Sequence, residues 1–311
     1  MRIMITGGLG FVGSHLAESL VGQKNQIIIV TKSLSKLQNI AAIKNKVKIE
    51  QVDVTDFNKF GKILDKYKPD VIFHLAGETS HSKSFENPLH DIDSNAKSTL
   101  FILEKIRKSN KKCKFILGST FIVVGRPDKL PVTEETPCNP TTIYGINRLA
   151  SEHYCKVYHT VYGLDTRIFR ITNGYGPREQ YLTTKNAVNY LIYKAFKDKQ
   201  ITVFNKGKFF RDLIFISDVI SALKIIMRKG KAGNLYWISC GKKTWFYEFG
   251  RLLEKLTDAK INYVSSPSYT KKVDVGNFVV DNSKLRALGW KPKINLREGI
   301  QKTLDYFSLI Q

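Results

Sequence analysis

Short apolar runs alternate with longer segments of helical spacing through the first half of the chain. The predicted strands are residues 2–6, 26–31, 47–54, 70–76, 113–119 and 165–172, and the predicted helices include 12–22, 56–67, 93–109 and 144–161. Buried strands that alternate with amphipathic helices are typical of βα units, whose parallel sheet is covered on both faces. The pattern therefore predicts an α/β fold with a doubly wound parallel sheet of the Rossmann type.

The regular alternation ends near residue 172. Shorter strands and helices follow in mixed order and without an internal repeat, which indicates a smaller α/β domain interleaved with the first. We expect residues 1–172 to form the Rossmann domain, with later segments returning to it, and residues 173–311 to form mainly a second domain. A long loop, residues 125–142, follows the predicted strand 113–119, and loops after strands carry the sites of doubly wound sheets.

Glycines crowd the turn after the first predicted strand. Residues 6–13 read TGGLGFVG, with the spacing G-x-x-G-x-x-G, and the helical segment SHLAESLV follows. Glycines allow a tight turn and a close approach of pyrophosphate to the backbone, and the helix start offers N–H groups to the phosphates. The first domain is therefore expected to bind a dinucleotide and the second a substrate. The predicted cofactor contacts in this turn are Gly7, Gly10, Phe11, Val12 and Gly13.

The end of the second predicted strand bears on which dinucleotide is bound. An acidic residue commonly holds the adenosine 2′-hydroxyl at this point, but the chain has Thr31, Lys32 and Ser33. A cation and hydroxyls favour a 2′-phosphate through charge-assisted hydrogen bonds. We therefore expect contacts from Thr31 and Lys32 to NADP, while a solvated Lys32 beside bound NAD remains open.

The third and fourth predicted strands end in further candidate cofactor contacts. Asp53 and Val54 could pair with the adenine amino group and pack on its ring, and Thr55 or Asp56 suits a helix N-cap better than Asp53 does. Ala76 is small enough for a cofactor to lie across the strand end. His74 stands within an apolar strand, so we interpret it as a packed core histidine.

Composition adds a large positive charge to this picture. The 311 residues include 50 Lys and Arg against 27 Asp and Glu, a formal charge of +23. Residues 1–155 hold 22 basic and 15 acidic residues, and residues 156–311 hold 28 and 12, so the excess lies mainly in the second half. The lysines are scattered without a long basic run, which favours a solvated surface with a subset at an anionic small molecule over nucleic-acid binding.

Cysteine usage and hydropathy exclude further classes. The four cysteines lack disulfide-framework or metal-ligand spacing, no apolar run approaches the length that spans a bilayer, and glycines interrupt the apolar N-terminus before a signal-peptide core could form. We therefore expect a cytoplasmic protein without a structural metal and without a membrane partner.

Several motifs together resemble one known family. The chain is similar over nearly its full length to extended short-chain dehydrogenases/reductases of the nucleotide-sugar epimerase/dehydratase family. The matching segments, in the family's order, are TGGLGFVG at 6–13, DVTD at 53–56, HLAG at 74–77, Asn95, GSTFIVVG at 118–125, YGINR at 144–148, RITNGYGP at 170–177, RDLIFISDV at 211–219 and DNSKLRALGW at 281–290.

The resemblance implies a catalytic constellation. Tyr144 would take a proton from a sugar hydroxyl while hydride passes from C4 to nicotinamide, and Thr120, with Ser119 as a second candidate, would hydrogen-bond the reacting oxygen. Asn95 would contact the cofactor. One helical turn after Tyr144 the family has a Lys that holds the nicotinamide ribose, and this chain has Arg148, which keeps the charge but reaches differently.

The resemblance also indicates the substrate side. The expected ligand is a nucleoside-diphosphate sugar, held by Asn173, Arg211 and Lys271, with Glu78 as the nearby acid. The dehydratase branch has an Asp-Glu pair after the hydroxyl residue, where this chain has Phe121 and Ile122, so 4,6-dehydration is disfavoured.

Three functions remain open at this point. The leading one is an NAD(P)-dependent epimerase that oxidises C4 and reduces it again from the other face. The alternatives are an NADPH-dependent reductase of a nucleotide-linked 4-ketosugar and a non-catalytic dinucleotide-binding member in which Arg148 has replaced the lysine. The helices 93–109 and 144–161 resemble the pair that the family buries in a homodimer.

Overall fold

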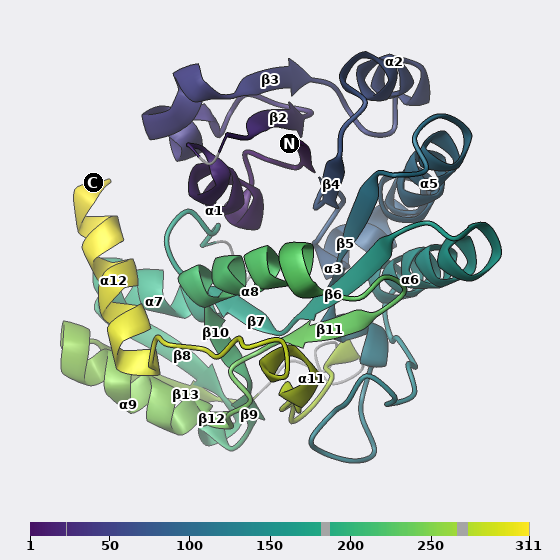
Figure 1. Cartoon of the computed structure of the whole chain (residues 1–311). Coiled ribbons are helices and arrows are strands. Elements are labelled where there is room, and N and C mark those ends of the chain that lie inside the picture. The colour runs from purple at the N-terminus through teal and green to yellow at the C-terminus, as the bar shows by residue number, and fades with distance from the viewer. Residues whose placement is uncertain (23, 182–186, 266–272, 311) are drawn as a thin grey trace. The chain divides into compact units, whose positions relative to one another are not determined.

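The computed structural model, drawn in Figure 1, describes residues 1–22, 24–181, 187–265 and 273–310. Its chain divides into two compact units. Unit 1 comprises Met1–Thr120, Thr142–Arg170 and Leu223–Tyr236. Unit 2 comprises Phe121–Thr141, Ile171–Ala222 and Trp237–Gln311. Each unit is therefore assembled from segments that are distant in the sequence.

A seven-stranded sheet in the order β11-β6-β5-β4-β1-β2-β3 forms the centre of unit 1. β1 pairs in parallel with both β2 and β4, so Ile3 lies between Ile27 and Val71. The strand order reverses beside β1, as it does in doubly wound folds that bind a ligand at this point. The strands are β1 (Arg2–Thr6), β2 (Gln26–Thr31), β3 (Lys48–Gln51), β4 (Val71–His74), β5 (Lys114–Thr120), β6 (Thr166–Ile171) and β11 (Leu235–Ile238).

Helices cover both faces of this sheet. α2 (Phe57–Tyr67), α5 (Ser98–Ser109) and α6 (Ile143–Tyr162) lie in a row on one side, and α1 (Phe11–Leu20) lies on the other (Figure 1). The predicted α/β class and doubly wound sheet are confirmed. The shorter helical segments of unit 1 are η1 (Leu37–Lys46), α3 (His81–Glu86), α4 (Pro88–Asp91) and η2 (Ile92–Lys97).

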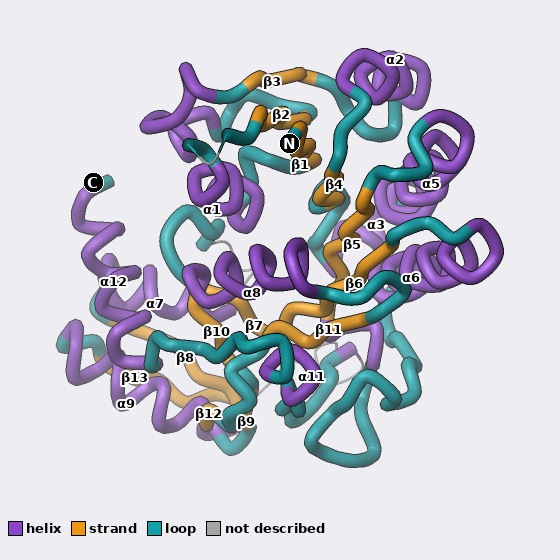
Figure 2. Tube along the Cα trace, viewed as in Figure 1, coloured by secondary structure: helices purple, strands orange, loops and turns teal. Residues whose placement is uncertain are grey.

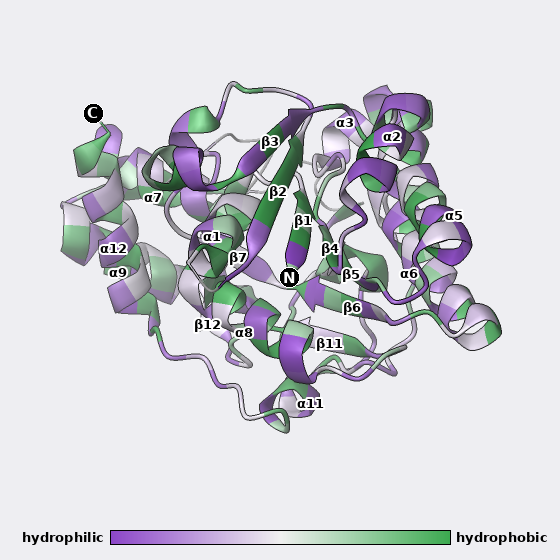
Figure 3. Ribbon diagram, turned by 45° about the horizontal axis from the view of Figure 1, so that its top comes forward, coloured by the Kyte–Doolittle hydropathy of each residue, from purple (hydrophilic) through white to green (hydrophobic). Residues whose placement is uncertain are grey.

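The core of unit 1 forms where the apolar strands meet the helices. Figure 3 shows β1 and β2 as largely hydrophobic ribbons, and the side chains Ile27–Val30 of β2 are buried. α2 is amphipathic: it buries Phe60 and Leu64 and exposes its lysines. The predicted strand and helix patterns therefore meet in one packed interior, as the hydrophobic effect requires.

The described residues of unit 2 form three two-stranded sheets, and Figure 2 shows their strands as short orange segments of the trace among helices and loops. β7 (Asn173–Tyr175) pairs in parallel with β10 (Leu213–Phe215), and β8 (Gln200–Phe204) with β13 (Lys260–Val264). β9 (Phe210–Arg211) and β12 (Thr244–Trp245) are antiparallel. The helices are α7 (Ala187–Lys197), α9 (Phe246–Thr257), α11 (Ser283–Arg286) and α12 (Leu296–Leu309), with short turns η3 (Phe121–Val124) and η4 (Asn205–Gly207), and α8 (Ile216–Lys229) leads the chain from unit 2 back to unit 1.

Two further observations concern the chain as a whole. Within the ranges that the structure describes, none of the helices combines the length and apolar character that a membrane crossing needs. The four cysteines are free thiols, of which Cys113 and Cys155 are buried.

Candidate active site

The glycine-rich turn between β1 and α1 is packed so closely that side chains would not fit. A Cβ on Gly13 would lie 2.4 Å from the carbonyl oxygen of Gly7, and Gly7 itself has φ +68° and lies against the backbone of Ala76. Gly10 is the N-cap residue of α1 and carries no side chain that could cap the first N–H groups. The turn therefore has the form of an anion cradle at a helix N-terminus.

The end of β2 is a polar, exposed turn. Thr31 Oγ1 donates a hydrogen bond to the Ser33 carbonyl at 2.9 Å, and Lys32 is exposed. Sequence reasoning missed Asn39, whose Nδ2 donates to the Leu9 carbonyl at 2.9 Å and thereby ties η1 to the glycine-rich turn. A buried asparagine in a short helix carries no sequence signal for such a role.

The end of β3 has the local structure of a helix start. Asp53 Oδ1 accepts hydrogen bonds from the N–H and hydroxyl of Thr55 at 3.0 and 2.9 Å. Asp56 caps α2 by accepting from the N–H of Lys59, in agreement with the sequence interpretation. Val54 is buried. The adenine contacts of Asp53 and Val54 remain predictions.

His74 is a core residue, as its sequence context predicted. Its ring is fully buried, with Nδ1 2.8 Å from Thr6 Oγ1 and Nε2 3.1 Å from Ser98 Oγ. Burial, together with the nearby Arg148 charge, lowers the pKa of His74 to about 3. The imidazole is therefore neutral at physiological pH and links β1, β4 and α5.

Tyr144 and Arg148 lie one turn apart on the buried side of α6, which begins with Thr142 as its N-cap. The Arg148 guanidinium donates from Nη1 to the Gly118 carbonyl at 3.1 Å and from Nη2 to the Ala76 carbonyl at 3.4 Å. Its Cζ lies 5.8 Å from the centre of the Tyr144 ring, a cation–π contact. The positive charge of Arg148 is thus held where β4 and β5 end, beside Tyr144.

The ring of His81 also contacts Tyr144, a contact that sequence reasoning missed. His81, in the first turn of α3, stacks on Tyr144 with ring centroids 5.7 Å apart and an interplanar angle of 20°. A histidine in a polar HSKSFE segment gave no sign of this contact.

Asn95 and Arg148 each have a buried polar atom without a hydrogen-bond partner among the described residues. Asn95 lies in the π-helical turn η2, a distortion often found at functional sites, and its Nδ2 donates to the Glu78 carbonyl at 3.2 Å. Among the described residues, Asn95 Oδ1 and Arg148 Nε are buried without a hydrogen-bond partner. Buried polar groups are normally satisfied, so these two atoms, with the glycine cradle, fit a site that completes its bonding with a dinucleotide.

Two buried hydroxyl side chains, Ser119 and Thr120, lie at the end of β5. Ser119 Oγ donates to Glu152 Oε1 at 2.5 Å, so this second candidate for the substrate contact is already engaged within the protein. Thr120 is 6% exposed. Its hydrogen bond to the reacting sugar oxygen remains a prediction. Glu78 Oε1 accepts from the N–H groups of Thr79 and Ser80 at 2.9 and 3.0 Å, which is a structural role for the predicted substrate-side acid.

Unit 2 holds the residues predicted for the diphosphate. Asn173 begins β7 and Arg211 ends β9. The Asn173 N–H donates to the carbonyl of Asp212, the residue after Arg211, at 3.1 Å. Arg211 is buried, pairs with Asp274 at 2.5 Å, and has its pKa lowered by that burial. Within the described ranges, Asn173 Nδ2 is a buried donor without a partner. Lys271 lies outside the described residues.

Asp212 is a further buried acid that the sequence did not single out. Its carboxylate accepts hydrogen bonds from the backbone N–H groups of Cys240, Gly241 and Val280. Burial raises the pKa of Asp212 to about 7 despite these donors. The residue ties together three segments of unit 2 next to Arg211.

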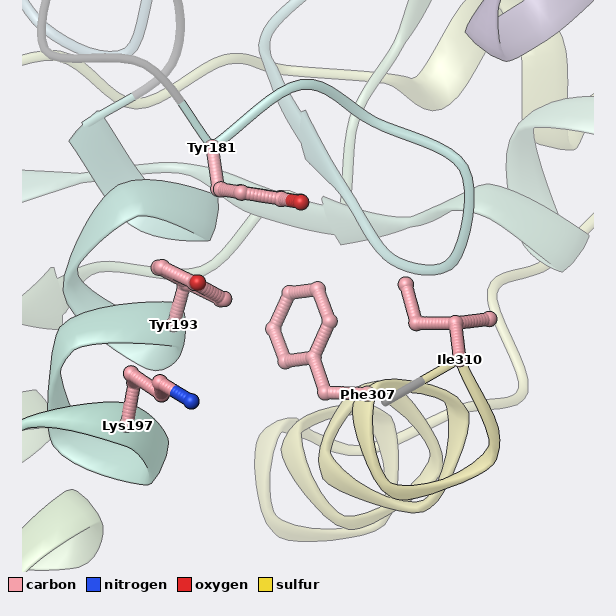
Figure 4. A pocket seen from close by; sticks show the side chains of 5 residues that line it. All are labelled: Tyr181, Tyr193, Lys197, Phe307 and Ile310. Carbon is pink, nitrogen blue, oxygen red and sulfur yellow. The ribbon is translucent and has the colours of Figure 1, made fainter.

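A separate cavity of about 410 Å³ lies between α7 and α12 (Figure 4). The rings of Tyr181 and Tyr193 stack with centroids 3.9 Å apart, and Phe307 meets both edge-on. Lys197 and Ile310 complete the lining, which includes no residue predicted for catalysis or cofactor binding. Nor do the described residues contain a cluster of His, Cys, Asp and Glu suited to a metal ion.

Comparisons with known proteins agree with this geometry. Residues 4–303 match the family model described as GDP-mannose 4,6 dehydratase. The chain therefore belongs to the extended short-chain dehydrogenase/reductase family of nucleotide-sugar epimerases and dehydratases, as its motifs predicted.

Three relatives illustrate the range of the family. The UDP-glucose 4-epimerase of Thermotoga maritima, solved with UDP-glucose, is 29% identical with a TM-score of 0.92, over 100% of this chain and 99% of that one. The Thermus thermophilus UDP-glucose 4-epimerase, solved with NAD, is 26% identical with a TM-score of 0.89, over 99% of both chains. The dTDP-glucose 4,6-dehydratase of Salmonella typhimurium is 28% identical over 99% of this chain and 92% of the relative.

Proposed function

We propose that the protein is an NAD(P)-dependent nucleoside-diphosphate-sugar 4-epimerase. The observation that carries this proposal is the Tyr144–Arg148 pair, held at the carboxyl ends of β4 and β5 by the Ala76 and Gly118 carbonyls. In a doubly wound sheet this edge, beside the glycine cradle after β1, is where a dinucleotide and its substrate meet. Solved relatives that bind NAD and UDP-glucose support the choice of ligands.

The reaction assigns a task to each residue of unit 1. A nicotinamide dinucleotide, when bound, supplies a hydride acceptor and donor for the sugar carbon C4. Tyr144 removes the proton of the 4-hydroxyl and returns it after the sugar has turned, while Thr120 hydrogen-bonds the same oxygen. Arg148 holds positive charge beside the phenol, and its Nε is the donor left for the cofactor.

The diphosphate falls to unit 2 in this proposal. Asn173 offers an unpartnered buried amide, and Arg211 offers a guanidinium whose geometry suits phosphate oxygens. Lys271 is the further proposed contact of the diphosphate. These groups bind the part of the substrate that does not react, which leaves the sugar free to present either face. Glu78 remains a proposed substrate contact as the acid of unit 1, apart from the diphosphate.

The sites after Thr120 argue against dehydration. Elimination of water across C5 and C6 needs an acid and a base, but Ile122 is buried and the Phe121 ring packs edge-on against Phe278 at 5.2 Å. Neither side chain can donate or accept a proton. The epimerase chemistry returns its proton within one turnover, so it also tolerates an arginine at 148 that does not relay protons readily.

A reductase of a nucleotide-linked 4-ketosugar is the second candidate. It is favoured by the turn at Thr31–Lys32, where the absence of an acidic residue suits NADPH. The two functions differ in stoichiometry, because a reductase consumes one reduced dinucleotide for each product and an epimerase consumes none.

The test incubates the purified protein with UDP-glucose and with either NAD or NADP, and follows products by anion-exchange chromatography. We expect the 4-epimer to form without net reduction of the dinucleotide, and Tyr144→Phe to lower kcat at least about a hundredfold because the proton acceptor is lost. A parallel incubation supplies NADPH and a nucleotide-linked 4-ketosugar. Consumption of NADPH there, with no epimer formed from UDP-glucose, would support the reductase instead.

A further inference from the structure

The helix that carries Tyr144 and Arg148 also carries a buried carboxylate, that of Glu152. Glu152 follows Arg148 by one helical turn on the same face of α6 and is completely buried. Its Oε1 accepts from Ser119 Oγ at 2.5 Å and from Arg170 Nε at 2.9 Å, and its Oε2 accepts from Arg170 Nη2 at 2.7 Å. One side chain of α6 is therefore bonded to both β5 and β6.

Both partners of Glu152 are shielded from water. Ser119 is 5% exposed and Arg170 is 2% exposed. A shift or rotation of α6 would separate an arginine from its carboxylate in an interior where solvent cannot replace the bond. A buried ion pair recovers its desolvation cost only with good geometry, so it adds little to the net free energy of folding. Its loss in a displaced arrangement is costly, so here it favours one position of α6 against β5 and β6.

The bonds of Glu152 fix the positions of the segments that carry the proposed reacting groups. Ser119 immediately precedes Thr120, so fixing its side chain fixes the backbone from which Thr120 extends. Glu152 likewise fixes the helix that carries Tyr144 and Arg148. We propose that Glu152, with Arg170, is a positioning residue that sets the relation between Tyr144 and Thr120. This inference rests on the proposed epimerase function.

The test separates positioning from stability with a compensated variant. Glu152→Gln keeps the volume but removes the carboxylate charge that pairs with Arg170, and it should lower both the melting temperature and kcat. The double variant Glu152→Met with Arg170→Met removes both charges at similar volume and should regain most of the melting temperature. We expect its kcat to stay at least about tenfold below that of the parent, with KM for UDP-glucose within about twofold, since the loss lies in alignment of the reacting groups.

A matched control comes from the other end of the same helix. Tyr158 of α6 donates to Glu104 of α5 at 2.5 Å, another carboxylate bond that anchors α6. Tyr158 lies 14 residues beyond Tyr144, about 21 Å along the helix. Glu104→Gln should therefore leave kcat unchanged. A double variant that recovers kcat together with its melting temperature would overturn the proposal, as would a Glu104→Gln variant that loses as much activity.

Crystal structures of the parent and the double variant give a readout that does not depend on turnover. We expect the separation of the Tyr144 and Thr120 hydroxyls to change by about 0.5 Å or more, the tolerance within which catalytic groups must be held. An unchanged separation would overturn the positioning role. A parent protein that fails to epimerise any sugar nucleotide would instead refute the proposed function, so the two failures are distinguishable.

Discussion

His74 makes the stability of the protein depend on pH in a direction that its surroundings fix. An unfolded histidine titrates near 6.5, whereas burial and the Arg148 charge lower the pKa of His74 to about 3 in the folded protein. As the pH falls below about 6.5, the unfolded chain takes up a proton that the folded chain refuses, so stability falls. Above about pH 6.5 the histidine is neutral in both states, so its titration no longer reduces the free energy of unfolding.

The size of this effect follows from linkage. Between about pH 7.5 and about pH 5, the difference in proton uptake at His74 costs the folded state about 2 kcal/mol. We expect urea unfolding of the parent protein to show this loss in addition to that from all other groups. His74→Gln removes the titrating ring, so it should lower stability at both pH values but lose about 2 kcal/mol less between them.

The difference between the two proteins isolates the histidine, because every other group titrates in both. A second variant tests the smaller of the two causes. Arg148→Gln removes the nearby charge and should raise the pKa of His74, which reduces the loss of stability below about pH 5. Equal losses for the parent and His74→Gln between the two pH values would refute the account of a buried, neutral imidazole.

Three further predictions concern the cofactor cradle, the dinucleotide and unit 2. Gly13→Ala would bring a Cβ to 2.4 Å from the Gly7 carbonyl oxygen, so it should weaken dinucleotide binding, measured by calorimetry, at least about tenfold. The control is Gly61→Ala, whose Cβ would meet only side-chain ends at 3.2 Å and which should leave binding unchanged. Lys32→Ala should weaken NADP binding about five- to tenfold and leave NAD binding unaltered; equal effects on both would contradict the 2′-phosphate contact. Because the pKa of Asp212 is raised to about 7, the folded state holds a proton that the unfolded state releases, so stability should fall as pH rises from about 4 to 7. Asp212→Asn should flatten that fall in urea unfolding, and an undiminished slope would exclude Asp212 as its source.

The sequence predicted the parts of this protein that depend on local pattern. The strands at residues 2–6 and 26–31 were placed at their observed bounds, since continuous apolar runs between turns leave few alternatives. The glycine turn was recognised because its spacing follows from the geometry of the backbone itself. The third strand was predicted at 47–54 and is shorter, Lys48–Gln51, because Asp53 and Asp56 are used to start α2.

Contacts between residues distant in sequence were not accessible in this way. The bond from Ser119 to Glu152 spans 33 residues, and nothing in either segment signals the other. The same holds for His81 on Tyr144 and for the Arg148 guanidinium, whose partners are backbone carbonyls of β5 and the loop after β4. Sequence reasoning identified the chemistry of Arg148, but only the folded chain shows which of its donors are already used.

The proposed epimerase reaction is tested most directly by isotope retention. The measurement supplies UDP-glucose labelled with deuterium at C4, in the presence of NAD or NADP, and analyses the products by mass spectrometry. We expect a mixture of the two 4-epimers with the deuterium retained at C4 and no net change in reduced dinucleotide, and no such product from Tyr144→Phe. A 4-keto-6-deoxy product, loss of deuterium to solvent, or stoichiometric accumulation of reduced dinucleotide would contradict the proposed reaction.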